Sequence, residues 1–159
     1  MESEPRSLVS PVADSVDEGG GWHGLWGRPE PDRLYGGLWA LHLRRPEDGL
    51  SAHHLIGVSW RGFVLGTFVN THEGRSWVAG IGRSVATAKG RSGALRLGYR
   101  LGLLAGYDER LMDMADRYPV IPAFQLLGDG RYGPVGIQVG WTWIVLYFGG
   151  FISLDILSD

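Results

Sequence analysis

The sequence predicts an all-β protein, specifically an eight-stranded antiparallel β-barrel. Over most of the chain, apolar residues alternate with small or polar ones, as expected for strands whose side chains point to two opposite faces. Glycine accounts for 26 of the 159 residues, about twice its usual share of roughly 7%. Eight such segments can be separated by turn signals, and an even number of antiparallel strands can close without leaving an edge.

The length of the chain fits one folded domain. Residues 1–21 are acidic and rich in Ser and Pro, with a run of glycines at 19–21, which predicts a disordered leader and a hinge. We therefore expect the barrel domain to cover residues 22–157. The N-terminal residues have neither the basic nor the apolar region of a secretory signal peptide.

The first long strand contains the candidate residue His42. In the stretch "GGLWALHLRR", Trp39, Leu41 and Leu43 fall on one face, and Ala40 and His42 fall on the other. The same alternation recurs along the chain, and it predicts strands at about 37–45, 53–61, 63–71, 76–87, 94–107, 120–130, 134–143 and 144–154.

Residues 132–154 carry no charge and would be long enough for a transmembrane helix. Apolar residues stand at every odd position from Val135 to Tyr147, while the even positions begin with Gly136, Gln138, Gly140 and Thr142. Because this period is that of a strand and Pro134 disfavours a helix, we expect a strand pair here.

The two faces of the predicted barrel leave two orientations open. A soluble barrel turns its bulky apolar face inward, whereas a membrane barrel turns it toward lipid. The minority face is rich in glycine, which suits a narrow interior better than a water-exposed surface, so we favour a membrane barrel. A soluble barrel or sandwich with its apolar face inward remains the alternative.

Composition excludes several classes of function. The net charge is −2 and the fifteen basic residues are scattered, so the chain has no electrostatic footprint for nucleic acid. The absence of cysteine removes disulfides, thiolate nucleophiles and Cys-ligated metals. His53 and His54 fit the solvated start of a strand better than a metal site, and we expect no metal or cofactor.

Several motifs, in order, resemble the outer-membrane lipid A palmitoyltransferases, the PagP family. They are "WGRPEPDRLYGGLWALH" at residues 26–42, "AGIG" at 79–82 and "YPVIPAFQLLGDGRYGPVGIQV" at 118–139. The resemblance covers about residues 22–154. It implies an eight-stranded barrel preceded by a short N-terminal helix, monomeric and located in the bacterial outer membrane.

The resemblance also implies an activity, the transfer of an acyl chain from a phospholipid to lipid A. The family histidine falls on His42, which would act as the base. The family's aspartate and serine fall on Asn70 and Thr71, and the glycine that limits acyl-chain length falls on Gly82. With Gly80 and Gly98, Gly82 would line the lumen that holds the acyl chain.

Asn70 departs from the family pattern. An amide does not stabilise an imidazolium as a carboxylate does, although its carbonyl can still accept a hydrogen bond. The alternative function is therefore a catalytically inactive PagP-like barrel that binds lipid or is structural, of a kind that a phage or mobile element could encode. Because no signal peptide is present, the alternative location is a protein not exported in this form.

The same residues also have purely structural interpretations. A strand histidine such as His42 often only satisfies a local hydrogen bond. Residues 70–74 have the composition of a simple hairpin loop. Arg96 and Arg100 share one face, where they could bind lipid phosphate, but because unpaired charges in a lumen are costly we expect them to pair with Asp or Glu.

Overall fold

The computed structural model describes residues 22–43, 50–69, 74–106, 118–142 and 145–154. The leader predicted at 1–21 and the candidate residues Asn70 and Thr71 lie outside these ranges. No helix in the described part is long and apolar enough to cross a membrane. The elements are α1 (Trp22–Trp26), β1 (Arg28–Pro29), β2 (Arg33–His42), β3 (Leu50–Trp60), β4 (Phe63–Val69), β5 (Arg75–Lys89), β6 (Gly93–Ala105), β7 (Val120–Tyr132), β8 (Val135–Trp141) and β9 (Val145–Ser153).

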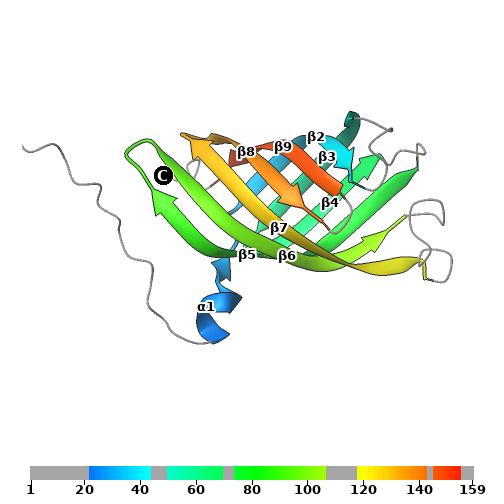
Figure 1. The fold of residues 1–159 in the computed structure, drawn as a ribbon, viewed down its shortest axis with the longest axis horizontal. Coiled ribbons are helices and arrows are strands. Elements are labelled where there is room, and N and C mark those ends of the chain that lie inside the picture. Colours follow the sequence, from blue (N-terminus) through cyan, green and yellow to red (C-terminus); the bar gives the residue numbers. More distant parts are fainter. Residues whose placement is uncertain (1–21, 44–49, 70–73, 107–117, 143–144, 155–159) are drawn as a thin grey trace, which may run out of the picture.

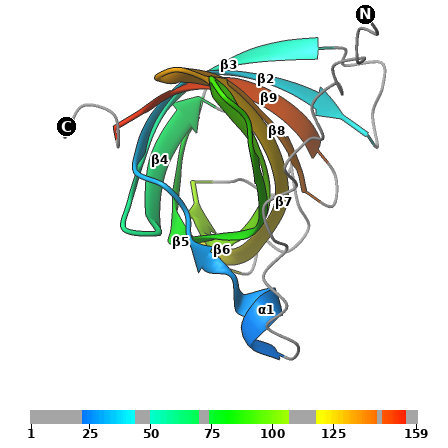
Figure 2. The same ribbon diagram turned by 90° about the vertical axis from the view of Figure 1, so that its left-hand side faces the viewer.

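Strands β2 to β9 form a closed antiparallel barrel, which confirms the predicted fold class (Figures 1 and 2). Each strand pairs with its neighbours in the chain, and β2 pairs with β9 to complete the ring. The short N-terminal helix is present as α1. Most strand bounds fall within a few residues of those predicted, but β2 begins earlier, at Arg33, and the two-residue β1 was not predicted.

The alternation of apolar and small or polar residues places the apolar face outward. On β6, Leu95 and Leu97 are 67% and 59% exposed, whereas Arg96 between them is 4% exposed. The same contrast holds on β8, where Ile137 is exposed and Gln138 is buried. On these two strands the large apolar residues therefore face outward and the charged or polar ones face inward, which is the reverse of a soluble barrel.

A β-bulge at Gly37 resets the alternation of β2. The register shifts between Gly36 and Leu38 along both neighbouring strands, and Gly37 has a φ of +69°. Because the bulge adds one residue, Tyr35 and Ala40 are both buried although their separation is odd. The predicted outward position of Trp39 and inward position of Ala40 are confirmed, and both depend on this bulge.

The two ends of the barrel differ in the length of their connections. At one end, which we call the turn end, Arg61 and Gly62 join β3 to β4, residues 90–92 join β5 to β6, and residues 133–134 join β7 to β8. At the other end, which we call the loop end, the connections at 43–49, 70–74, 106–119 and 142–144 are mostly longer.

The N-terminal segment reaches the interior where β4 leaves an edge of β5 open. Strand β1 pairs with β5 just beyond the point where β4 begins, and the backbone N–H of Glu30 donates to the carbonyl of Gly82 at 2.9 Å. Helix α1 lies outside the barrel (Figure 2). There the Arg83 guanidinium stacks 4.8 Å from the Trp26 ring, and the Tyr99 hydroxyl donates to the Trp26 carbonyl.

The turn at Gly62 offers a test of this packing. Gly62 has a φ of +81°, and a Cβ there would lie 2.9 Å from Cβ of Pro29, whereas Gly133 has a φ of +57° and open space around it. Both Gly→Ala changes carry a backbone penalty of about 1 kcal/mol, but only Gly62→Ala also displaces the N-terminal segment. We expect Gly62→Ala to lower the urea midpoint of unfolding clearly more than Gly133→Ala, and equal effects would contradict this packing.

Candidate functional site

The Glu30 carboxylate is the centre of a charged network inside the barrel. Glu30 is 1% exposed. Its Oε2 accepts from Nε of Arg100 at 2.8 Å and its Oε1 accepts from the Arg100 Nη2 at 2.6 Å, so the pair is bidentate. The Tyr35 hydroxyl also donates to Oε1, and the Arg96 Nη2 lies 3.2 Å from the same atom. One carboxylate from outside the long strands thus joins side chains of β2 and β6.

Asp129 of β7 extends the network toward the turn end. The Arg96 Nε donates to its Oδ2 at 2.6 Å, and the Arg33 Nη1 lies 3.0 Å from its Oδ1. Arg96 also donates to the Ser84 hydroxyl at 3.0 Å. The guanidinium of Arg33 stacks 3.9 Å from the ring of Phe151, while its Nε has no hydrogen-bond acceptor within the described ranges.

A chain of neutral side chains continues the network toward β8 and β9. The Arg100 Nη2 donates to the Gln138 side-chain oxygen at 3.1 Å, and the Gln138 amide donates to the Tyr147 hydroxyl at 3.4 Å. The Tyr147 hydroxyl in turn donates to the Gln125 side-chain oxygen at 3.0 Å. These four side chains belong to β6, β7, β8 and β9, so the network links four neighbouring strands inside the barrel.

This network confirms the pairing interpretation of Arg96 and Arg100, since both are bound to carboxylates. The sequence analysis did not predict which carboxylates. Glu30 was matched only as part of the family motif, and Asp129 stood in a strand pattern with no assigned partner. An acidic residue at a predicted inward position of β7, opposite Arg96 in register, is the signal that would have identified Asp129.

The interior nearer the loop end is lined by apolar and small side chains. Ala40, Leu127 and Tyr147 form a buried cluster against which Val145 packs. Ile121, near the loop end of β7, is also buried. Tyr147 joins the two parts, because its ring belongs to this cluster and its hydroxyl to the network, and the buried charges lie toward the turn end.

The three glycines predicted to line the lumen lie at different levels of β5 and β6. Gly80 is one inward position nearer the loop end than Gly82, and Gly98 lies between Arg96 and Arg100 on the inward face of β6. Gly82 lies directly against Glu30, because a Cβ built there would be 1.9 Å from the Glu30 Oε2. The carboxylate therefore occupies the space that the missing side chain leaves.

The predicted catalytic residues are only partly described. His42 is the last residue of β2, and its backbone pairs with Val145 at the loop end. Its side chain lies outside the described parts of the structure, as do Asn70 and Thr71, which follow the end of β4 in the sequence. Strands β2 and β4 both end at the loop end.

Metal binding has no support in the part of the chain that the structure describes. No group of three or more His, Asp or Glu residues there is arranged to hold a metal ion. His54 is exposed on β3, and the side chain of His53 lies outside the described parts.

A scan against protein-family models found no match to this chain, and a search of curated proteins found none either.

Removing the Glu30 charge tests how much the barrel depends on the network. Glu30→Gln leaves Arg100 and Arg96 buried with one carboxylate fewer, and breaking a buried pair costs about 3–5 kcal/mol. Asp32→Asn is the matched control, because Asp32 lies two residues away and accepts a hydrogen bond from the exposed backbone N–H of Arg61. We expect a large loss of unfolding free energy in urea for Glu30→Gln and a much smaller one for Asp32→Asn. Equal losses would show that the network contributes little.

Proposed function

We propose that this chain is an integral membrane β-barrel that transfers an acyl chain from a phospholipid to lipid A, as the resemblance to the PagP family implies. The observation that carries the membrane part is the inverted barrel, with apolar side chains outward on every long strand and charged ones inward. Soluble proteins rarely expose so many large apolar side chains on one continuous surface, whereas membrane barrels do.

The outward apolar surface is continuous around the barrel. Each of the eight long strands contributes at least two large exposed apolar residues, which include Leu34, Ile56, Leu65, Val85, Leu101, Phe124, Ile137 and Ile152. An apolar band of this kind fits the hydrocarbon core of a membrane, where the closed ring leaves no unpaired strand edge.

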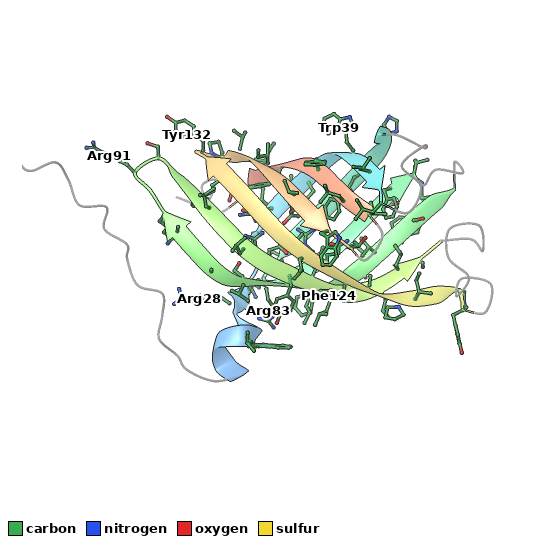
Figure 3. All side chains as sticks on the ribbon, viewed as in Figure 1. Arg28, Trp39, Arg83, Arg91, Phe124 and Tyr132 are labelled. Carbon is green, nitrogen blue, oxygen red and sulfur yellow. The ribbon has the colours of Figure 1, made fainter. Side chains whose placement is uncertain are left out.

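Aromatic residues gather near both ends of this surface. Trp39, Trp77 and Trp141 are exposed toward the loop end, and Trp60 and Tyr132 are exposed toward the turn end. Figure 3 shows Trp39 and Tyr132 pointing away from the barrel near its two ends. Aromatic girdles at both interfaces, with short turns on one side and longer loops on the other, are typical of outer-membrane barrels.

The interior supports the acyl-chain part of the proposal. The apolar lining lies toward the loop end, where His42 ends β2, and the Glu30–Arg100 pair closes off the charged part below it. An acyl chain entering from the loop end would meet apolar and small side chains first. Gly80 would then line its path, and the Glu30 carboxylate, which covers Gly82, would mark the lower limit.

In the proposed reaction, one ester forms while another breaks. A lipid A hydroxyl attacks the phospholipid ester carbonyl, and the imidazole of His42 takes the hydroxyl proton and returns it to the leaving lysophospholipid alcohol. Thr71 would supply the hydroxyl of the family serine. Asn70 would orient the imidazole through its carbonyl oxygen, without the negative charge of the family aspartate.

The second candidate is a PagP-like barrel that binds lipid without catalysing transfer. Asn70 favours it, because replacing the orienting carboxylate of a catalytic histidine by an amide has cost about 10⁴-fold in rate in the serine protease triad. The two candidates share the membrane barrel and differ only at the loop end.

The membrane part is tested by charge placed on the outer surface. Leu101 and Leu95 face outward on the same strand, and Leu101 pairs with Phe124, which lies near the middle of the barrel's length (Figure 3). An outward arginine costs about 2–4 kcal/mol at the bilayer midplane and about 0–1 near the interface. We expect Leu101→Arg to destabilise the protein in lipid vesicles by that larger amount and Leu95→Arg by the smaller. Equal and small costs would argue against a membrane location.

The catalytic part is tested by assaying transfer from a labelled phospholipid to lipid A with the refolded protein in detergent. We expect transfer with the natural sequence, at least about 100-fold less with His42→Ala, since a positioned base contributes about 10²–10⁴-fold, and faster transfer with Asn70→Asp. A well-folded barrel without transfer, which Asn70→Asp also fails to activate, would leave the lipid-binding barrel as the better account.

A further inference from the structure

A small basic pocket lies at the turn end, on the far side of the charged network from His42. It has a volume of about 210 Å³ and is lined by Lys89, Arg91, Arg131 and Ser92, with glycine backbone between them. Neither the proposed catalysis nor the sequence analysis gives these residues a role.

Two turns that are bonded to each other build this pocket. Beyond Gly82, β5 continues to Lys89 with β6 as its partner, so the β5–β6 hairpin extends past the turn between β3 and β4 (Figure 1). The hairpin is closed by the Gly90 N–H donating to Gly93 at 2.8 Å. The Gly133 N–H donates to the Ser92 carbonyl at 3.1 Å, which ties the turn between β7 and β8 to the same hairpin.

The strand register brings the cations together. Lys89 of β5 pairs with Ala94 of β6, and Ala94 pairs with Arg131 of β7. Lys89 and Arg131 therefore lie on the same face, with β6 between them. Arg91 lies at the tip of the hairpin between them in sequence (Figure 3). Three positive charges that share one small pocket repel one another unless an anion lies among them.

The charge balance of this pocket differs from that of the Glu30–Asp129 network deeper inside the barrel. Arg33, Arg96 and Arg100 each pair with Glu30 or Asp129. Within the described ranges, no carboxylate pairs with Lys89, Arg91 or Arg131, and the Arg131 Nη1 donates to the Ser153 hydroxyl at 3.1 Å. The pocket therefore has an excess of cationic donors and includes Ser92 in its lining, a combination that suits an oxyanion.

The surroundings indicate the source of that oxyanion. Tyr132 and Leu95 come directly after Arg131 and Ala94, so their side chains point to the outer face of the same strands, where they are 73% and 67% exposed. A basic pocket at the rim of an outward apolar and aromatic surface matches an amphiphile whose anionic head lies over the rim and whose tails lie along the barrel wall.

We propose that this pocket binds a phosphate-type oxyanion, as carried by a phospholipid headgroup at the turn end. The inference goes beyond the proposed acyl transfer, because the pocket lies at the opposite end from His42 and does not need the catalytic residues. A phospholipid held here would contact the guanidinium groups through its phosphate oxygens.

The test is binding to the full chain refolded in an uncharged detergent. The probes are phosphatidylglycerol, diacylglycerol, which lacks the phosphate, and inorganic phosphate, each followed by isothermal titration calorimetry. We expect phosphatidylglycerol to bind and diacylglycerol not to. The double variant Lys89→Gln, Arg91→Gln should lose affinity by at least about tenfold, because each charge-assisted hydrogen bond is worth more than a neutral one.

The matched control is Arg61→Gln, which removes an exposed arginine from another turn at the same end. Both altered residues of the double variant are exposed, so folding should persist, and the barrel circular dichroism spectrum checks this. Binding of phosphatidylglycerol alone supports a headgroup site, and binding of inorganic phosphate as well supports a general phosphate site. Equal binding of diacylglycerol, or an equal loss in Arg61→Gln, would overturn the proposal. Neither result depends on acyl transfer, so a failure of the catalytic proposal would be seen separately.

Discussion

The Glu30 carboxylate is the constraint on which the interior of this barrel depends. It reaches the interior from the segment between β1 and β2, so two buried arginines of β6 depend on a residue outside that strand. Burying a guanidinium without a partner would cost several kcal/mol, so the position of the N-terminal segment and the placement of Arg96 and Arg100 are coupled. Gly82 belongs to the same constraint, because a side chain there would occupy the place of the carboxylate.

The inverted distribution of side chains follows from this interior. A barrel of eight strands has a narrow interior, and here several of the side chains inside it are charged and mutually bonded. The large apolar residues therefore point outward, where they form a continuous surface. The polar interior and the apolar exterior thus have one cause, because successive side chains of each strand point alternately into and out of the barrel.

Much of the fold could be predicted from the sequence because it depends on local periodicity. The eight strands and the outward faces of β6 and β8 follow from alternation alone. The bulge at Gly37 could not be predicted, since Gly36 and Gly37 look alike in the sequence and only the pairing with two neighbours decides which one is added. The partners of Arg96 were missed for a similar reason. Glu30 is 66 residues away, and only the closed ring brings the two together.

The candidate site was predictable to a smaller extent. The sequence identified His42 by its strand and by a family motif, and the topology places it at the loop end with the end of β4. The basic pocket could not be predicted, because Lys89 and Arg91 are far from Arg131 in the sequence. Only the pairing of β5, β6 and β7 brings the three side chains together.

The charged network also divides the chemistry of the two ends. Glu30 connects Tyr35 of β2 with Arg100 of β6 on the opposite wall of the barrel, with apolar lining toward the loop end and the cationic pocket toward the turn end. An acyl chain gains nothing by entering a region of paired charges, because it would have to displace hydrogen bonds that are costly to leave unmade. On the proposed function, the chain must then enter and leave at the loop end, and a headgroup at the turn end must bind independently of it. The depth of the Glu30 carboxylate below the loop end would accordingly set the longest acyl chain that the barrel can accept.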